Sequence, residues 1–431
     1  MTYRDILGLG FMTLCLFVGA GNIIYPPMVG LQAGANVWIT ACGFLVTAVG
    51  LPIITVIILA GVGGEMSKLS APIGKSASTL LAVVCYLSVG PLFAMPRTAT
   101  VSFEIGIVPF LDSSAVPIVL FLFTFAYFAF ALWVALYPTK LLDTVGNILS
   151  PLKLLALAIL GIAAFLYPAG TFGSMTEKYQ IAPFAQGFSD GYLTMDTLAA
   201  LVFGIVIVDA IRSRNITSRE QIIRYATIAS IMALVGFILI YISLFKLGNS
   251  SFSLAPDAPN GAVILRSYVR HTFGIYGDVF LGVLITIACL VTAIGLTTAC
   301  ATYFSGLLKI SYRWTALALV VWAFAFANLG LTRLIEISVF ALTVIYPPCI
   351  VLILLNLVKP FFLKPSWVFS SVMFVALIFG ILDALKSLEL PWLSWYSQLP
   401  LAQSGLTWML PALAVLCVVV IMERITGDKT V

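Results

Sequence analysis

Long apolar runs alternate with short polar turns along the whole chain. Each run holds about 20 residues, which is the length that an α-helix needs to cross the hydrocarbon core of a bilayer. The pattern predicts an all-α membrane protein with twelve transmembrane helices, whose boundaries are soft by several residues. The predicted spans are 5–31, 36–61, 78–106, 116–137, 147–168, 188–212, 220–247, 277–308, 312–330, 334–357, 366–385 and 405–424.

Basic residues are distributed unevenly between alternate connections. With the N-terminus inside, fifteen of the 22 lysines and arginines fall on the inner side, Lys153 among them, and six fall on the outer side. Lysine and arginine are enriched in cytoplasmic loops, so the alternation predicts both termini in the cytoplasm. The net charge of +5 follows from this bias and does not indicate nucleic-acid binding.

Composition excludes several other classes of protein. Charged residues make up 9% of the chain, against about 25% in soluble domains. The seven cysteines form no Cys-x-x-Cys pair, and no His, Cys or carboxylate cluster has the spacing of a metal enzyme. A Walker-type phosphate loop is missing as well, and the longest loops, 169–187 and 248–276, are too small for a soluble active site. We therefore expect a polytopic protein that is neither an enzyme nor a nucleotide-driven pump.

A few polar side chains lie deep inside the predicted spans. Such residues are costly in a membrane and usually mark a functional site. The candidates are Arg97, Glu104, Asp196, Thr297, Thr298 and Glu336.

The first span is interrupted by glycines and prolines in "FVGAGNIIYPPMVG", residues 17–30. One interpretation is a broken helix. The free N–H groups of its second half then suit a carboxylate, and the free carbonyls of its first half suit a small cation. The other interpretation is a proline kink with small residues for helix packing. The motif alone does not decide between them.

Several segments resemble one known family. These are "FVGAGNIIYPPMVGLQAG" (17–34), "GPLFAMPRTATVSFE" (90–104), "YPTKLLDTVGN" (137–147), "DGYLTMDTLAALVFGIVIVDA" (190–210) and "IYPPCIVLILLNL" (345–357). They resemble the LIVCS family of bacterial branched-chain amino acid:cation symporters, over essentially the whole chain. The resemblance implies the LeuT-type fold, in which two inverted repeats of five helices each begin with a broken helix. The repeats would be 1–168 and 188–357, with spans 366–424 peripheral.

The resemblance also implies a substrate site at the first break. The amides of Gly19, Ala20 and Gly21 would hold the α-carboxylate of the substrate, and Asn22 follows where related sodium-coupled carriers use a side-chain oxygen. In span six the resemblance places the break at Phe203 and Gly204, with Phe203 packing on an apolar substrate side chain.

A cation site is implied beside the substrate. The backbone carbonyls of Cys15 and Val18, the carbonyl of Ile294 and the hydroxyls of Thr297 and Thr298 would bind sodium, since hard cations prefer oxygen ligands. The alternative for the threonines is that their hydroxyls bond back to their own helix.

The remaining charges keep more than one interpretation. Arg97 and Glu104 lie two turns apart on one helix face, too far apart for an easy direct pair, so we expect each to have a partner on another helix. A transporter gate and a static structural pair are both open for them, and Glu336 could serve either. Asp196 is a structural acid, a gate or a second cation ligand.

The sequence therefore predicts a symporter in the bacterial inner membrane that imports leucine, isoleucine and valine with sodium. Proton or lithium coupling is the alternative; some carriers of this fold place a positive group in the cation site, but no lysine lies near Thr297 in the sequence. The sequence does not indicate an oligomeric state. An intramembrane protease and a channel are disfavoured, because neither an aspartate pair nor a filter motif is recognisable.

Overall fold

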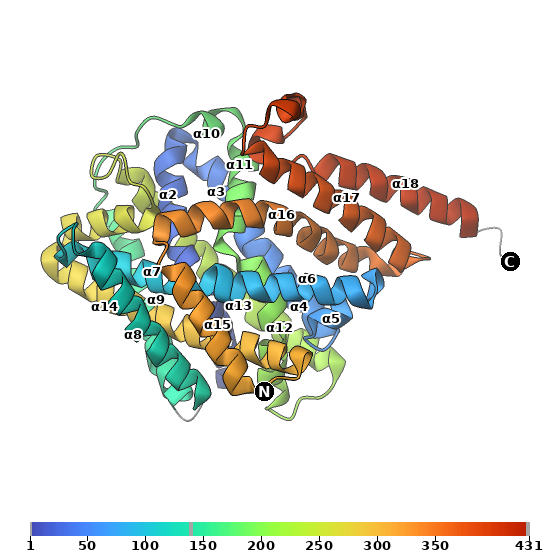
Figure 1. The fold of residues 1–431 in the computed structure, drawn as a ribbon, viewed down its shortest axis with the longest axis horizontal. Helices are drawn as coiled ribbons and strands as arrows, with labels where there is room; N and C mark the ends of the chain where they lie inside the picture. Colours follow the sequence, from blue (N-terminus) through green and yellow to red (C-terminus); the bar gives the residue numbers. More distant parts are fainter. Residues whose placement is uncertain (1, 138–140, 428–431) are drawn as a thin grey trace.

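The computed structural model describes residues 2–137 and 141–427, with the side chains of 141–152 and 426–427 left aside. This part of the chain is helical and contains no strand (Figure 1). The α-helices are α1 (Tyr3–Phe17), α2 (Ala20–Ala33), α3 (Val37–Leu45), α4 (Leu51–Gly61), α5 (Met66–Leu69), α6 (Lys75–Leu87), α7 (Ala94–Gly106), α8 (Val116–Leu136), α9 (Leu141–Leu166), α10 (Glu177–Ile181), α11 (Pro183–Asp190), α12 (Asp196–Arg212), α13 (Arg219–Ser250), α14 (Gly261–Leu308), α15 (Tyr312–Ala327), α16 (Leu331–Val358), α17 (Pro365–Lys386) and α18 (Met409–Gly427).

Seven helical stretches in the described residues are long and apolar enough to cross a membrane, and one bent pair raises this number to eight. The predicted number of twelve spans is larger because some predicted spans are broken or short. α1 and α2 together form the first predicted span, for example, and α15 is only 16 residues long. The number twelve stays a prediction.

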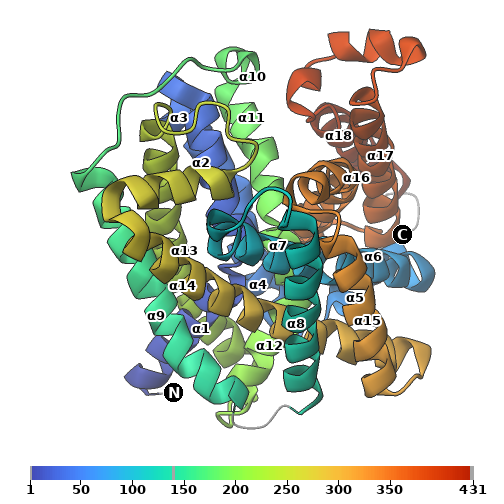
Figure 2. The ribbon, with the colours of Figure 1, turned by 60° about the vertical axis from the view of Figure 1, so that its left-hand side comes forward.

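The core of the bundle surrounds α2, α7, α12 and α14. α14 packs against α7, while α13 packs against both α1 and α2. α17 and α18 contact each other and lie along one side of the bundle, with α17 against α16 (Figures 1 and 2). The division into two inverted repeats stays a prediction, and residues 1 and 138–140 of the first one lie outside the described residues.

The first span is broken where the glycines predict it. α1 ends at Phe17, and Val18 and Gly19 have extended backbone before α2 begins at Ala20. Pro26 and Pro27 lie inside α2, so the prolines do not make the break. Because the break ends one helix and begins another, it exposes carbonyls of α1 and N–H groups of α2.

The sixth span is also broken, but not at the predicted residues. The short helix η6 (Gly191–Thr194) ends at Met195, which has φ 66° in the left-handed region, and α12 starts directly afterwards. The helices on the two sides meet at 44°. α12 is continuous through Phe203 and Gly204, so placing the break there was wrong. Gly204 instead permits close packing, since a Cβ atom at this position would lie 2.5 Å from Leu59 Cδ1.

One predicted loop is largely helical. Residues 248–276 were expected to form a long outer loop, yet α14 begins at Gly261 and is interrupted by Gly274, with φ 65°. Asn260 caps this helix by accepting hydrogen bonds from the N–H groups of Ala262 and Val263. The polar residues of the segment misled the prediction, because a capped helix can carry them on an exposed face.

Candidate functional site

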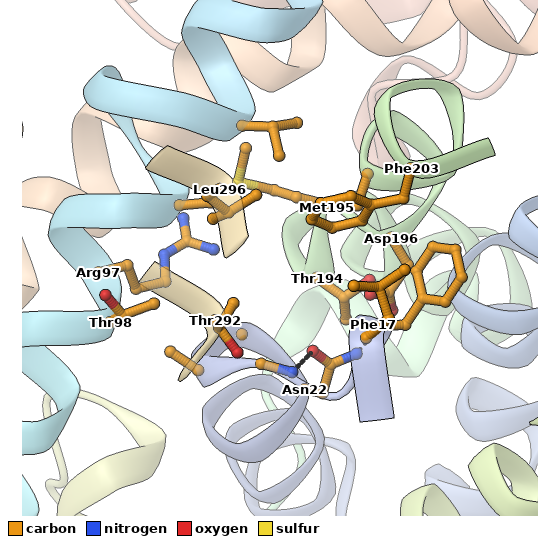
Figure 3. A pocket seen from close by; sticks show the side chains of 17 residues that line it. Phe17, Asn22, Arg97, Thr98, Thr194, Met195, Asp196, Phe203, Thr292 and Leu296 are labelled. Atoms are coloured by element: carbon orange, nitrogen blue, oxygen red, sulfur yellow. Dashed lines mark hydrogen bonds between the residues drawn. The ribbon is translucent and has the colours of Figure 1, made fainter. Parts of the chain in front are cut away.

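Both breaks face one small cavity near the centre of the bundle (Figure 3). Its volume is about 40 Å³, which is room for at least one water molecule. Most of its wall is apolar or small, with a few polar groups between. The lining residues are Leu16, Phe17, Gly19, Ala20, Gly21, Asn22, Val89, Ala94, Arg97, Thr98, Thr194, Met195, Asp196, Ala199, Phe203, Thr292 and Leu296.

The start of α2 presents backbone N–H groups to this cavity. The N–H of Gly19 donates to Asn22 Oδ1 at 2.8 Å, so it is already satisfied within the helix cap. The next residues, Ala20 and Gly21, occupy the first turn, whose N–H groups have no acceptor inside the helix. Together with the positive end of the helix dipole they form a place for an anion.

A buried polar cluster joins α2, α12 and α13. Asn22 Nδ2 donates to Asp196 Oδ2 at 2.7 Å and to the Tyr241 hydroxyl at 2.6 Å, and Tyr241 donates to the same Asp196 oxygen at 2.8 Å. Asn22 and Asp196 are among the residues predicted from the sequence, whereas Tyr241 is not. No local signal marks a tyrosine in an apolar helix as polar, because its partners lie on other helices.

Arg97 on α7 reaches the cavity from the opposite side to Asp196 (Figure 3). Its Nη1 donates to the Leu193 carbonyl at 2.8 Å and its Nη2 to Ser338 Oγ at 2.7 Å, while the guanidinium carbon lies 5.1 Å from the centre of the Tyr25 ring. Arg97 therefore has its expected partners on other elements.

The other two predicted charges lie away from the cavity. Glu104 on α7 is half-buried, and within the described residues it has no ion pair within 4 Å. Glu336 is exposed on α16.

Most of the predicted cation ligands have hydrogen-bond partners within the protein. The Val18 carbonyl, freed by the break, accepts a hydrogen bond from Lys153 Nζ on α9. The hydroxyls of Thr297 and Thr298 donate back to Ala293 and Ile294 at 2.7 and 2.9 Å. Neither threonine lines the cavity, whereas Thr292 on the same helix does.

Lys153 is the residue that charge counting misplaced. It was assigned to the cytoplasmic side, but its side chain is buried, with 5% exposure, against the end of α1. The sequence offers one signal for this position, a lysine inside the apolar run 147–168. Cys15, also predicted as a carbonyl ligand, is half-buried near the end of α1.

An aromatic group closes the apolar side of the cavity. The rings of Phe17 and Phe203 meet edge to face with their centres 6.3 Å apart, and Phe237 packs on the other side of Phe17 at the same distance. Phe203 thus lines the cavity although it lies in a continuous helix, and its contact with a substrate side chain stays a prediction. Gly204 does not line it.

Comparison with known proteins places the chain in a family. Residues 2–426 match the family described as "Branched-chain amino acid transport protein". The chain belongs to this family. Among its relatives are the branched-chain amino acid transport system 3 carrier protein of Pseudomonas aeruginosa, 57% identical over 98% of this chain and 97% of the relative, and the branched-chain amino acid permease BrnQ of Escherichia coli K12, 54% identical over 99% and 97%.

A more distant relative in the family is also named a branched-chain amino acid permease. Branched-chain amino acid permease BraB of Bacillus subtilis is 40% identical over 95% of this chain and 93% of its own length. These relatives are named carriers and permeases, not enzymes. With its apolar helices, the family member described here is an integral membrane protein.

The fold is shared with a solved transporter. Mhp1, a nucleobase-cation-symport-1 family transporter, matches with a TM-score of 0.60 over 98% of this chain and 93% of its own, at 13% identity. A second structure of Mhp1, in an inward-facing conformation, also matches with a TM-score of 0.60. The likeness establishes the LeuT-type fold, which was predicted from the sequence.

Proposed function

We propose that the protein imports leucine, isoleucine and valine across the bacterial inner membrane by symport with a cation. The observation that carries the proposal is a cavity at two helix breaks that combines an anion-binding helix start with an apolar wall. The amides of Ala20 and Gly21 bind the α-carboxylate. Phe17, Phe203 and Leu296 surround the aliphatic side chain, and the branched-chain amino acid names of the relatives support this substrate class.

The cavity volume is about 40 Å³ in this structure, so we expect the helices around the cavity to move apart when leucine enters. Discrimination among leucine, isoleucine and valine should be shallow, since one methylene in an apolar pocket changes binding by about 1–3 kcal/mol.

Counterflow tests the substrate class independently of the coupling ion. Purified protein is reconstituted into liposomes loaded with one unlabelled amino acid, and exchange of external radiolabelled leucine is measured. We expect exchange with internal leucine, isoleucine or valine and none with lysine or glutamate. Equal exchange with all of them, or exchange with none, would contradict the assignment.

Sodium is the first candidate for the coupling ion. Its support is chemical: the break frees carbonyl oxygens at the end of α1, and the fold is shared with a transporter described as a cation symporter. Thr297, Thr298 and the Ile294 carbonyl would have to turn from their present partners toward the ion. The hydroxyl rotamers of threonine permit such a change.

A proton is the second candidate, and one contact favours it. The ammonium group of Lys153 donates to the Val18 carbonyl, which is one of the oxygens predicted to bind sodium. A lysine in this position supplies a positive charge that is fixed to the protein. The side chain gains this charge when it binds a proton and loses it when it releases one.

Replacement of Lys153 by methionine separates the two candidates. Uptake of leucine is measured in sodium and in choline, each with and without a pH gradient, for both proteins. If a proton is carried on Lys153, Lys153→Met abolishes accumulation driven by the pH gradient, while counterflow persists. If sodium is the coupling ion, wild-type accumulation requires sodium at every pH, and the variant changes the sodium affinity instead. Lys178→Met, outside the cavity, is the control.

A further inference from the structure

The cavity contains one positive and one negative side chain. Among its lining residues, Arg97 is the only cation and Asp196 the only anion. Both side chains are nearly inaccessible, with residue exposures of 1% and 2%. No ion pair within 4 Å joins them, although they face the same cavity (Figure 3).

Within the part of the chain that the structure describes, Arg97 has no anionic partner within 4 Å. Its two hydrogen bonds go to a carbonyl and a hydroxyl, its third contact is the face of an aromatic ring, and its Nε atom has no hydrogen bond. A charge removed from water is destabilising unless an opposite charge compensates it. The arrangement leaves the guanidinium with uncompensated charge toward the cavity.

Asp196 is the converse case. The groups that donate to its Oδ2 are the Asn22 amide and the Tyr241 hydroxyl, which are both uncharged. Within the described residues no lysine, arginine or histidine approaches this carboxylate within 4 Å. Asp196 is therefore held in place by neutral donors, with no cation beside it.

We propose that the two charges recognise the two ends of a zwitterionic amino acid: Arg97 binds the α-carboxylate and Asp196 the α-ammonium group. The inference rests on the proposed function and specifies how the substrate is recognised. A single α-amino acid carries the two opposite charges on groups attached to one carbon atom, so it compensates both residues at once. The position of Arg97 supports its assignment to the carboxylate. A Cβ atom on Gly21 would lie 3.4 Å from Arg97 Nη1, so the guanidinium lies beside the free amides of α2.

Two leucine analogues test the two ends separately. 3-Methylbutylamine keeps the side chain and the ammonium group but lacks the carboxylate, and 4-methylpentanoate keeps the carboxylate but lacks the ammonium group. Binding of each compound and of L-leucine is measured by calorimetry on purified wild type and on Arg97→Gln and Asp196→Asn. Wild type should bind each analogue at least 10-fold more weakly than leucine, because a hydrogen bond to a charged group contributes about tenfold or more in affinity.

The variants should respond selectively. Arg97→Gln should weaken leucine about 10- to 100-fold and leave 3-methylbutylamine unchanged. Asp196→Asn should weaken leucine and the amine but not 4-methylpentanoate. Arg97→Lys keeps the charge without the planar fork and should recover part of the leucine affinity. Glu104→Gln, on the same helix as Arg97 but away from the cavity, should not change the ratio between ligands.

Several results would overturn the inference. If wild type binds 3-methylbutylamine as tightly as leucine, the protein does not recognise the carboxylate. This result does not depend on the folding of any variant. Equal weakening of all ligands by Arg97→Gln would assign Arg97 a structural role. An effect seen only in chloride and not in gluconate would assign Arg97 to a bound chloride ion. If wild type binds no leucine at all, the proposed function itself fails. Failure of the inference alone is seen instead in the ratios between the ligands while wild type still binds leucine.

Discussion

At the first break, the Gly19 N–H group is bonded within the protein, while the next N–H groups are the ones proposed to bind the ligand. Asn22 uses its side-chain oxygen to cap Gly19 and its amide to hold Asp196. Gly19 and Gly21, on the two sides of Ala20 in the motif, differ in how much space surrounds them. A Cβ atom on Gly19 would have its nearest neighbour at 3.6 Å, which is an ordinary contact, whereas one on Gly21 would lie 3.1 Å from the Thr194 carbonyl oxygen.

This difference predicts a graded response to substitution. Gly19→Ala should retain leucine uptake, since the alanine methyl has room and the backbone there is extended. Gly21→Ala should reduce uptake strongly, because the two broken helices must move apart. Gly19→Leu should abolish uptake while the protein still inserts, since the larger side chain blocks the carboxylate. Uptake by each variant, corrected for the amount in the membrane, provides the measurement; normal uptake by Gly19→Leu would place the substrate elsewhere.

A site residue could be predicted from the sequence where its signal lies in the neighbouring residues of the chain. Gly19, Ala20, Gly21 and Asn22 are visible in sequence because small residues interrupting an apolar run act locally. Tyr241 and the burial of Lys153 depend on contacts with α12 and α1. The contacts of Tyr241 leave no trace in composition or spacing, whereas Lys153 leaves one signal, its place inside the apolar run 147–168.

At the scale of helices, the two breaks have different physical causes. The first lies at glycine, which readily leaves the helical conformation. The second lies at Met195, whose φ of 66° is unfavourable for a residue with a side chain. No glycine or proline stands there, so sequence reasoning moved the break to Gly204, where the glycine serves helix packing. The surrounding structure, with α12 beginning at the polar Asp196, determines the break.

The strain at Met195 leads to a prediction. Met195→Gly should preserve thermal stability, since glycine adopts this conformation freely and this gain offsets its entropic disadvantage. Met195→Ile should lower stability by about 1–3 kcal/mol, because a branched side chain is worst tolerated in the left-handed region. Thermal unfolding in detergent measures both. If Met195→Ile is as stable as wild type, the left-handed break does not persist in the protein.

For the whole molecule, the apolar pattern and the family resemblance together predicted the class and the fold. They also predict an orientation, which the fold by itself does not establish. α10 lies at the opposite end of the bundle from the N-terminus (Figure 1). If the N-terminus is cytoplasmic, α10 faces outward and the turn between α14 and α15 faces inward.

Cysteine labelling checks this orientation. On a background without native cysteines, Thr176→Cys and Ser311→Cys place one exposed thiol before α10 and one before α15. A membrane-impermeant maleimide added to intact cells should label Thr176→Cys and leave Ser311→Cys unlabelled until the cells are opened. The reverse pattern would invert the topology predicted from the lysine and arginine distribution.

We propose that this chain couples leucine movement to a cation gradient through the cavity at the two breaks. The most direct test is accumulation of radiolabelled leucine in proteoliposomes at clamped voltage, with an inward sodium gradient, an inward proton gradient, or neither. We predict that at least one gradient drives internal leucine transiently above its external concentration, and that without a gradient leucine only equilibrates. Mere equilibration under all three conditions would show a passive pathway and contradict the account.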